Sequence, residues 1–377
     1  MARLRKSNLD LVLATLASGE AMSQSALVAA TGLSAAAVSG LVAELSGQGR
    51  VEVREGVANG RRARLVSRSA GVRVFGAGID IGRTHVRVVV GDQHGGIRAE
   101  SYSEIPGRET PTLALDIVSA GVDKAVSDAG MSRNELAVIS VATVSSLDPV
   151  SGAVRSGPAG SMWTDFPLVE RLESATGLPV RLQNDANLGA LALGLALGSE
   201  RGILFIKVGT GIGAGLVVDG RLFTGNVGTV GEIGHLALDP SLAVTCECGR
   251  RGCLETRSSS EAVRRSFSTA LDRELTMAEA VEFARGESPV ALAVLDEAGT
   301  FLGKALGWIA QTINPAAIYL EGPFVSGDGP YLGAVRAAFK QSVWPAIFSS
   351  TVLDASPLEP RTVAVGALVS GLAAVSP

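Results

Sequence analysis

Cysteine, histidine and aromatic residues are scarce in this chain of 377 residues. It has three cysteines and three histidines, and Phe, Trp and Tyr together make up 4% of the sequence. Three cysteines cannot all pair with one another, so a disulfide-rich secreted domain is excluded. The chain also lacks any run of the roughly 20 apolar residues that a membrane-spanning helix requires. These absences predict a cytoplasmic protein without membrane insertion.

Glycine and aliphatic residues are abundant instead. The sequence has 46 glycines and is 46% hydrophobic, which is typical of strands and helices joined by many tight turns. We therefore expect an α/β protein with two or three domains. Residues 1–18 have basic residues followed by apolar ones, as a secretion signal does, but Asp10 interrupts the apolar run. An amphipathic helix is the better interpretation of that segment.

Charge divides the chain near residue 70. Residues 1–70 contain nine Lys or Arg and five Asp or Glu, a net charge of +4. Because the whole chain carries −4, residues 71–377 carry −8. The basic part is therefore the N-terminal segment, and its charge suggests a partner different from that of the remainder.

The basic segment has the pattern of a winged helix-turn-helix. Three helical patterns begin at Ser7, Ser23 and Ser34, and each serine can cap a helix. "TGLS", between the second and third patterns, is the kind of tight turn that joins the two crossing helices of a helix-turn-helix. "VEVREG" and "RRARLV" then predict two strands, with Asn59-Gly60 as their hairpin turn.

Arginines of this hairpin and serines of the third helix are the candidate DNA contacts. The third helix would enter the major groove, but its small exposed residues offer no long side chain for bidentate base contacts. The arginines would neutralise phosphates and supply much of the affinity. We expect double-stranded operator DNA to be contacted by Ser34, Ser39, Arg54, Arg61, Arg62 and Arg64. The alternative is a small helical dimerisation module whose arginines are only solvated.

Two glycine-rich hairpins of the same design occur at residues 74–96 and 203–225. Taken singly, each is explained equally well by the steric needs of a turn. Their repetition predicts two similar α/β lobes facing across a cleft, where glycine amides and threonine hydroxyls can approach an anion. The candidate nucleotide contacts are Gly82, Thr84, Gly209, Thr210, Gly211 and Gly213.

"GEIGHLALDPSLAVTCECGRRGCLE", at residues 231–255, holds all three cysteines. His235, Cys246, Cys248 and Cys253 supply one imidazole and three thiolates, a donor set of tetrahedral zinc. Four protein ligands close the coordination shell, so the zinc would be structural. The alternative, buried cysteines without a metal, gives no role to the glycines that let the loop turn back on itself.

Acidic and amide side chains accompany this motif. Glu232 and Glu255 flank it, so a loop folded around zinc would bring both carboxylates toward one point, where they could accept hydrogen bonds from sugar hydroxyls. "LQNDANLGAL", at residues 182–191, adds a polar cluster that includes Asn184 and Asp185. Such residues also begin helices, so a simple helix cap is the alternative.

Taken together, the paired glycine hairpins, "QNDAN", "GEIGH" and "CLE" resemble the ROK family (repressors, open reading frames, kinases) over about residues 7–375. The resemblance implies a two-lobed, actin-like ATPase fold shared with sugar kinases, and an N-terminal winged helix is typical of the family's repressors. The expected domains are a winged helix-turn-helix in 1–70, a first α/β lobe in 71–185 completed by a C-terminal helix in 360–377, and a second lobe in 186–359 with the zinc loop and a dimerisation surface.

The resemblance also implies roles for single residues. It implies the same four zinc ligands, and Asp185 matches the general base of the family's sugar kinases. The implied sugar contacts are Asn184, Asp185, Glu232, His235 and Glu255. Trp163, in "SMWTDFPL", would lie beside the sugar, although it could equally belong to the core.

Three positions depart from the kinase pattern. The first phosphate turn has Arg83 where the kinases have glycine, so a long side chain stands where a phosphate would approach bare backbone. Glu321 replaces one of two consecutive glycines near the adenosine, and Ala159 replaces an asparagine on the sugar side. These departures weigh against ATP binding and against retained kinase activity, and they leave the identity of the sugar open.

The sequence therefore favours a transcriptional repressor that binds operator DNA as a homodimer or homotetramer and responds to a sugar or sugar phosphate. One alternative is an ATP-dependent sugar kinase with Asp185 as base. Another is a regulator controlled by a protein partner, in which the sugar pocket has lost its role.

Overall fold

The computed structural model describes residues 8–9, 11–13, 15–16, 21–47, 50–58, 61–68, 73–93, 95–105, 111–144, 166–197, 202–239, 241 and 244–375. The chain forms two compact units, Met1–Arg73 and Val74–Pro377. Within the described residues, no single helix is long and apolar enough to cross a membrane. Helices α2 (Gln24–Thr31) and α3 (Ala35–Gly47) meet the length and composition criteria only together, as a bent pair.

The first unit is built on helices that end where the sequence provides caps. Helix α2 (Gln24–Thr31) begins after Ser23, whose hydroxyl accepts a hydrogen bond from the Ala26 amide, and it ends at Gly32 in the left-handed conformation. Helix α3 (Ala35–Gly47) follows at an angle of 114°. The described residues between 8 and 15 are also helical. These helices bury a small core whose members are Val12, Leu13, Leu16, Leu27, Val38, Leu41, Val42, Leu45, Val51 and Val66.

A three-stranded antiparallel sheet completes this unit. Its strands are β1 (Met22–Ser23), β2 (Val51–Ala58) and β3 (Arg61–Arg68), in the order β1-β3-β2. The β2–β3 register runs from Val51 opposite Arg68 to Ala58 opposite Arg61. The two predicted strands are therefore present, and the predicted turn at Asn59-Gly60 lies outside the described residues.

The described residues of the second unit form two five-stranded sheets with the same topology. The first sheet has β4 (Phe75–Ile81), β5 (His85–Asp92), β6 (Ile97–Glu104), β7 (Leu136–Thr143) and β8 (Val180–Asn184), in the order β6-β5-β4-β7-β8. The second has β9 (Ile203–Val208), β10 (Ile212–Val218), β11 (Arg221–Leu222), β12 (Ala317–Glu321) and β13 (Val352–Ala355), in the order β11-β10-β9-β12-β13. In each sheet three antiparallel strands are extended by two parallel ones. The repetition that predicted two similar α/β lobes is matched by two sheets of the same strand order.

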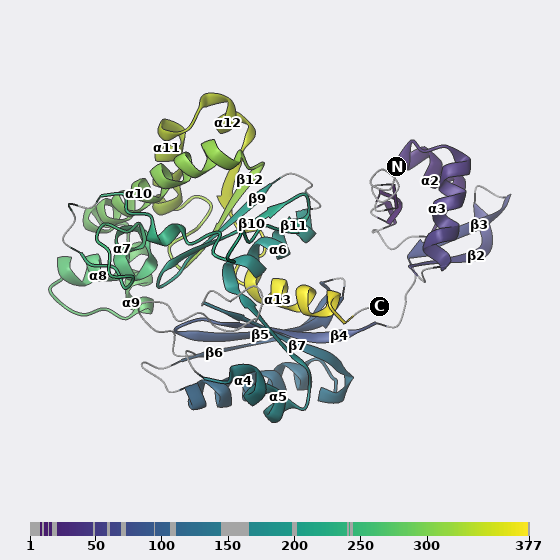
Figure 1. The fold of residues 1–377 in the computed structure, drawn as a ribbon, viewed down its shortest axis with the longest axis horizontal. Coiled ribbons are helices and arrows are strands. Elements are labelled where there is room, and N and C mark those ends of the chain that lie inside the picture. The colour runs from purple at the N-terminus through teal and green to yellow at the C-terminus, as the bar shows by residue number, and fades with distance from the viewer. Residues whose placement is uncertain are drawn as a thin grey trace. The chain divides into compact units, whose positions relative to one another are not determined.

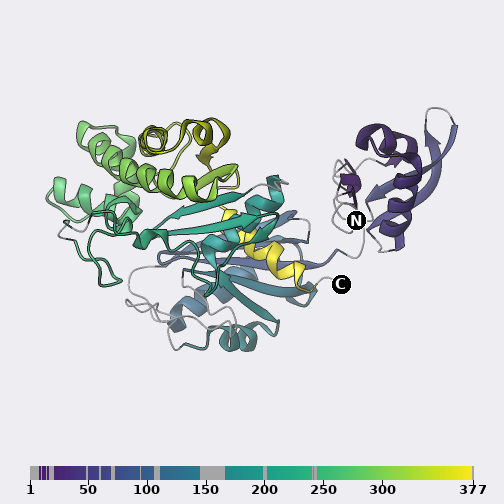
Figure 2. The same ribbon diagram turned by 45° about the horizontal axis from the view of Figure 1, so that its top comes forward.

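Helices separate and cover the two sheets (Figures 1 and 2). Helices α4 (Pro111–Asp128) and α5 (Leu168–Thr176) cover the outer face of the first sheet, and α10 (Pro289–Ile313) and α11 (Pro330–Ser342) cover that of the second. Helices α6 (Asp185–Leu197) and α13 (Thr362–Ala373) lie between the sheets. The remaining helical segments are η1 (Arg133–Glu135), η2 (Ile233–His235), α7 (Glu255–Ser258), α8 (Ser260–Ala270), α9 (Met277–Arg285) and α12 (Pro345–Ser350).

Small residues allow the two inner helices to approach each other closely. Helix α13 packs against β4, β5, β7 and α6. At Gly366 a Cβ atom would lie 1.9 Å from the Leu188 carbonyl oxygen of α6, so no larger residue fits there without a shift of the backbone. The C-terminal helix is thereby fixed against the first sheet and against α6.

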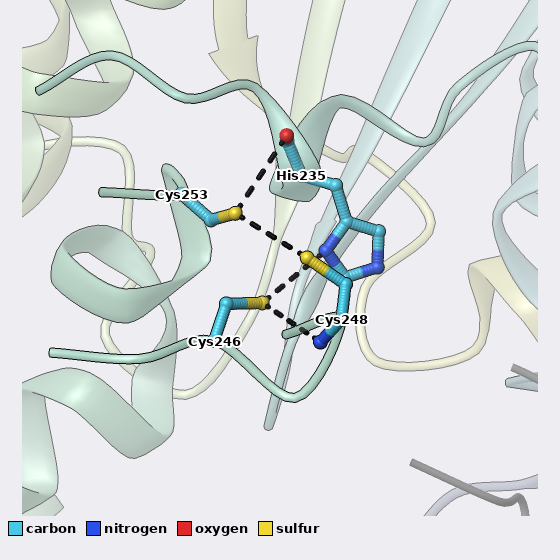
Figure 3. A group of neighbouring side chains, drawn as sticks. All are labelled: His235, Cys246, Cys248 and Cys253. Atoms are coloured by element: carbon cyan, nitrogen blue, oxygen red, sulfur yellow. Dashed lines mark hydrogen bonds between the residues drawn. The ribbon is translucent and has the colours of Figure 1, made fainter. Parts of the chain in front are cut away.

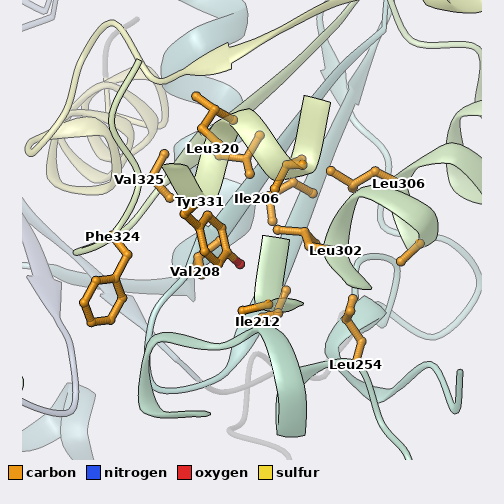
Figure 4. Packing of buried hydrophobic residues seen from close by; sticks show 14 of the residues in the cluster. Ile206, Val208, Ile212, Leu254, Leu302, Leu306, Leu320, Phe324, Val325 and Tyr331 are labelled. Atoms are coloured by element: carbon orange, nitrogen blue, oxygen red, sulfur yellow. The ribbon is translucent and has the colours of Figure 1, made fainter. Parts of the chain in front are cut away.

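Apolar packing on the outer side of the second sheet fixes the ends of β9, β10 and β12 (Figure 4). Each fully buried Leu, Ile or Phe contributes about 1.5–3 kcal/mol relative to exposure. The buried residues drawn there include Ile206, Val208, Ile212, Leu254, Leu302, Leu306, Leu320, Phe324, Val325 and Tyr331. Tyr331 also donates a hydrogen bond of 2.6 Å to the Ser258 carbonyl, which ties α11 to the end of α7. This core therefore supports the loops that leave the sheet.

Candidate metal centre and ligand site

Four side chains converge in the loop after β11 (Figure 3). One ligand atom from each of His235, Cys246, Cys248 and Cys253 lies within 4.8 Å of the other three. Cys246 Sγ is 3.4 Å from His235 Nδ1, and Cys248 Sγ is 3.6 Å from Cys253 Sγ. Bonds of 2.0–2.3 Å around a tetrahedral ion place neighbouring ligands about 3.4–3.8 Å apart. The cluster that the spacing predicted could therefore hold a metal ion such as zinc.

The backbone of the loop brings these ligands together. The η2 turn presents His235, and the Cys246 amide donates to the Arg250 carbonyl at 2.8 Å, which closes the turn around Cys248. Gly249 and Gly252 have φ values of 82° and 73°, a region that glycine adopts without strain. An isolated bridge between Ala237 and Cys253 returns the chain to η2. The sequence interpretation of the glycines as turn residues agrees with this geometry.

The surroundings of Cys248 favour the form that binds metals. Burial opposes ionisation, but hydrogen bonds from Arg250 and from the neighbouring thiols lower the pKa of Cys248 to about 6. Burial and the nearby Glu255 carboxylate raise the pKa of Cys246 well above its usual range. Because thiolates are the ligands, metal binding would displace the Cys246 proton. The hydrogen bond from the Cys246 thiol to Glu255 would then be lost.

Two carboxylates meet the imidazole of His235 from different sides. Glu255 Oε1 is 3.5 Å from His235 Nδ1 and accepts a hydrogen bond of 2.8 Å from Cys246 Sγ. Glu232 Oε2 is 3.9 Å from His235 Nε2. A Cβ atom at Gly211 would lie 2.8 Å from Glu255 Oε2, so this carboxylate borders the β9–β10 turn. The structure therefore brings together Glu232, His235 and Glu255.

The "QNDAN" segment both caps a helix and faces the second sheet. The Asn184 side-chain oxygen accepts a hydrogen bond of 3.1 Å from the Asn187 amide, so Asn184 is a helix cap at the start of α6. Asp185 Oδ1 accepts from the Ala186 amide at 2.8 Å, and its Oδ2 lies 2.9 Å from Lys207 Nζ. Burial raises the pKa of Asp185.

The predicted phosphate turns occupy the ends of β4 and β9. The Gly82 amide donates to the His85 carbonyl and the Gly209 amide to the Gly211 carbonyl, both at 2.9 Å, so these two amides are bonded within their own hairpins. Thr84 is exposed, and Thr210 is partly buried. A Cβ atom at Gly213 would lie 3.4 Å from that of Ala186, which places this turn beside the start of α6.

Two departures from the kinase pattern fall on described residues, and their surroundings differ. Arg83 forms a bidentate ion pair with Glu247, with distances of 3.3 and 3.0 Å. The pair joins the turn after β4 to the loop that carries the four candidate metal ligands (the metal loop). Glu321 is 8% exposed, burial raises its pKa, and its Oε2 atom is buried without a hydrogen-bond partner. Ala159 and Trp163 lie outside the described residues.

Lys207 is the central residue that the sequence reading missed. Its ammonium is 3.0 and 3.2 Å from the two Asp80 carboxylate oxygens, besides its contact with Asp185. Burial alone would raise the pKa of Asp80, but Lys207 and His85 hold it well below its usual range. Burial alone would lower the pKa of Lys207, yet Asp185 and Asp80 raise it. The available signal was a lysine inside the apolar strand "ILFIKV", since a buried lysine requires a charged partner.

A pair of glutamates at the edge of this region makes stability depend on pH. Burial and the nearby Glu321 raise the pKa of Glu359 from 4.5 to about 7. A raised pKa means that folding favours the protonated acid. The stability that protonated Glu359 contributes is therefore complete below the ordinary carboxyl pKa and is lost as pH rises through 7. We expect the melting temperature of the wild type to fall relative to that of Glu359→Gln when pH is raised from about 5 to about 8.

Scanning calorimetry at a series of pH values measures this difference. Glu282→Gln, at a surface position 76% exposed, is the matched control and should follow the wild type. Parallel melting curves for the wild type and Glu359→Gln at every pH would contradict the assignment.

The candidate DNA contacts are at the surface of the first unit. Ser34, Ser39, Arg54, Arg62 and Arg64 are exposed. Ser34 caps α3, since its hydroxyl accepts a hydrogen bond of 3.2 Å from the Ala37 amide. Ser39 and Arg64 line one hollow of about 290 Å³ between α3 and the sheet. The backbone of Arg61 lies in β3, and its side chain is outside the described part.

Comparisons with known proteins identify relatives of two kinds. A family model described as "ROK family" matches residues 76–370. The xylose repressor of Bacillus subtilis (strain 168) is 26% identical over 370 residues, which cover 96% of this chain and 94% of the repressor. A glucokinase of Halalkalibacterium halodurans is 29% identical over 291 residues, which cover 72% of this chain and 86% of the kinase. The crystal structure of a ROK family transcriptional regulator, a homologue of the E. coli MLC protein, has a TM-score of 0.71 at 21% identity and covers 97% of this chain and 95% of that one. This last likeness shows a shared fold.

Proposed function

We propose that this chain, which belongs to the ROK family, is a sugar-responsive transcriptional repressor that acts in the cytoplasm. One observation carries the proposal. A separate N-terminal unit, Met1–Arg73, precedes the part that the family model matches, and the similarity to the xylose repressor extends over 96% of the chain and so includes most of this unit. A sugar kinase has no need of such a basic module, whereas a regulator of DNA does.

The DNA-binding part of the proposal concerns residues 1–70 as a winged helix-turn-helix. Helix α3 would lie in the major groove, with Ser34 and Ser39 near the bases, and the β2–β3 hairpin would contact phosphates. The exposure of Arg54, Arg62 and Arg64 supports this. Arg64 lies opposite Glu55 in the β2–β3 register, which lowers the net positive charge there, whereas Arg62 lies opposite Val57. Arg62 is therefore the better phosphate contact.

Replacing Arg62 should weaken DNA binding without changing its sequence preference. Arg62→Ala removes one phosphate contact, so we expect a roughly uniform loss of affinity across DNA sequences and a salt slope reduced by about 1. Fluorescence anisotropy with duplex DNA at several salt concentrations measures both. Arg285→Ala, at an exposed position on α9 of the other unit, is the control. An unchanged salt slope in Arg62→Ala would remove the hairpin from the proposed interface.

The sensing part of the proposal concerns the metal loop and the start of α6. A structural Zn²⁺ held by His235 and the three cysteines would fix Glu255 and Glu232 around the imidazole, and these groups would accept hydrogen bonds from sugar hydroxyls. Asn184 and Asp185 would complete the sugar contacts. The convergence of both glutamates on His235, at 3.9 Å or less, supports this assignment.

Coupling between the two parts would run through the relative arrangement of the lobes, taken as residues 71–185 with 360–377, and residues 186–359. A homodimer, or a homotetramer built from such dimers, would present paired winged helices to half-sites about 34–36 Å apart. A sugar or sugar phosphate that prefers one lobe arrangement would shift operator affinity by its differential affinity, typically about 5 to 150-fold.

Selection of duplex DNA from a random pool, followed by anisotropy with a panel of pentoses, hexoses and their phosphates, tests the function. The expected result is one preferred sequence whose affinity changes with one class of sugar. Protein that binds no duplex DNA at low salt would exclude the proposal. Sequence-specific DNA binding that no sugar alters, with no sugar binding in calorimetry, would favour control by a protein partner.

Phosphorylation of the sugar is the second candidate function. It is favoured by the glucokinase relative at 29% identity and by the retained Gly209-Thr210-Gly211 turn, with Asp185 as the base and ATP held by the glycine turns. Release of ADP that depends on a sugar, and that Asp185→Asn abolishes, would establish it.

A further inference from the structure

Lys207 joins the two sheets of the second unit at a buried point. Lys207 is on β9 of the second sheet, whereas Asp80 is on β4 of the first and Asp185 directly follows β8 of the first. The ammonium lies 2.9–3.2 Å from oxygens of both carboxylates. The exposed fractions of the three side chains are 14%, 5% and 8%, so water does not separate the charges. One protein cation is thus held by two buried carboxylates from the opposite lobe.

The contact of Lys207 with Asp80 lies close to the start of both glycine turns. Asp80 precedes Gly82 by two residues, and Lys207 precedes Gly209 by two residues. A metal ion that accompanies an anionic ligand on the two turns would therefore lie beside the Asp80 and Asp185 carboxylates. The Lys207 ammonium already occupies that position.

Acidic groups outnumber the cation here. Glu321 is opposite Lys207 in the β9–β12 register, is 8% exposed, and has one carboxylate oxygen without a hydrogen-bond partner. His85 Nε2, 3.3 Å from Asp80 Oδ2, is a second contact of that carboxylate. Several buried carboxylates without a cation repel one another, and among metal ions the hard divalent cations that prefer oxygen ligands are the ones that relieve such repulsion.

We propose that Lys207 is a specificity-determining residue whose ammonium takes the place that Asp80 and Asp185 would otherwise give to a divalent cation. By holding both carboxylates, Lys207 removes the protein ligands of a metal–nucleotide complex and repels its metal. Glu232 and His235 lie in the loop after β11 that carries the candidate metal ligands, Glu255 begins helix α7 after it, and all three would serve a neutral ligand. This inference concerns divalent-cation and nucleotide binding and does not depend on DNA binding or on the identity of the sugar.

Lys207→Met tests the proposal, since methionine keeps the length and apolar stem of lysine and removes the charge. The probe is Mn²⁺ alone, added to zinc-loaded full-length protein, because Mn²⁺ prefers carboxylates and is the weakest of the first-row ions at nitrogen and sulfur sites. Paramagnetic resonance counts the bound ions. We expect one additional Mn²⁺ per chain in Lys207→Met, and a melting temperature raised by about 5 °C at saturating Mn²⁺.

Two further variants complete the experiment. Lys124→Met removes an exposed lysine that also pairs with an aspartate, at 2.8 Å, and should bind no more Mn²⁺ than the wild type. The double variant Lys207→Met/Asp80→Asn lacks one carboxylate and should lose the added site.

Each outcome decides the proposal. If Lys207→Met is unfolded without Mn²⁺ and refolds with it, the proposal is supported, because the ion replaces the ammonium. The proposal is overturned if Lys207→Met binds no more Mn²⁺ than the wild type does, or if it stays unfolded in Mn²⁺. An equal gain in the double variant also overturns it, because the ion would then be bound elsewhere.

Discussion

Cys253→Ser is expected to abolish metal binding by the cluster and, under the proposed function, to weaken sugar binding on the order of 100-fold or more. Cys253 is buried, and its sulfur is 3.6 Å from that of Cys248. A serine hydroxyl is a poor ligand for zinc at neutral pH, so the coordination shell would open. The loop would then no longer fix Glu255 and His235, and each hydrogen bond to a charged group contributes about 1.5–3 kcal/mol.

Elemental analysis of the purified protein and calorimetry with the effector sugar measure the two losses. Val244→Ser, an exposed change in the same loop, should retain both the metal and the sugar affinity. DNA affinity without sugar should change little in Cys253→Ser, because the first unit has its own core. A variant that keeps one metal ion per chain, or that loses the metal and still binds sugar as the wild type does, would contradict the role given to the metal loop.

The cluster of candidate metal ligands could be predicted because its four residues are close in sequence. His235 and the three cysteines lie within one loop, so their spacing and the glycines between them determine which atoms can meet. The two glycine hairpins were recognisable for the same reason, since each is a local strand–turn–strand pattern. Their repetition was enough to predict two lobes, and the two sheets have the same strand order.

Contacts between distant segments could not be predicted in this way. Arg83 was interpreted only through its effect on phosphate binding, because its partner Glu247 is 164 residues away in the sequence. Lys207 escaped notice because Asp80 lies on β4 and Asp185 directly follows β8 of the other sheet, and no periodicity connects these segments. For Asn184 the sequence predicts either a helix cap or a sugar contact, and the structure shows the cap.

Asp80→Asn is expected to destabilise the second unit by about 3 kcal/mol. Asp80 is 5% exposed in its side chain and holds both Lys207 and His85. Removing one partner from a buried ion pair typically costs about 3–5 kcal/mol, since the other charge loses its compensation. The lower figure applies because Asp185 still accompanies the ammonium at 2.9 Å. Urea unfolding at neutral pH, followed by circular dichroism, measures the loss.

The size of this effect separates a buried ion pair from an exposed one. Asp128→Asn breaks the Lys124–Asp128 pair, which is at the surface, and should cost less than about 0.5 kcal/mol.

The lowered pKa of Asp80 means that the stability contributed by its ionised carboxylate is present above the ordinary carboxyl pKa and is lost in acid. The free energies of unfolding of the wild type and Asp80→Asn should therefore converge as pH falls below about 4. The double variant Lys207→Met/Asp80→Asn should lose less stability than the two single variants lose in sum. The second change removes the charge that the first left uncompensated. Equal costs for Asp80→Asn and Asp128→Asn would mean that the buried ion pair does not stabilise the contact between the two sheets.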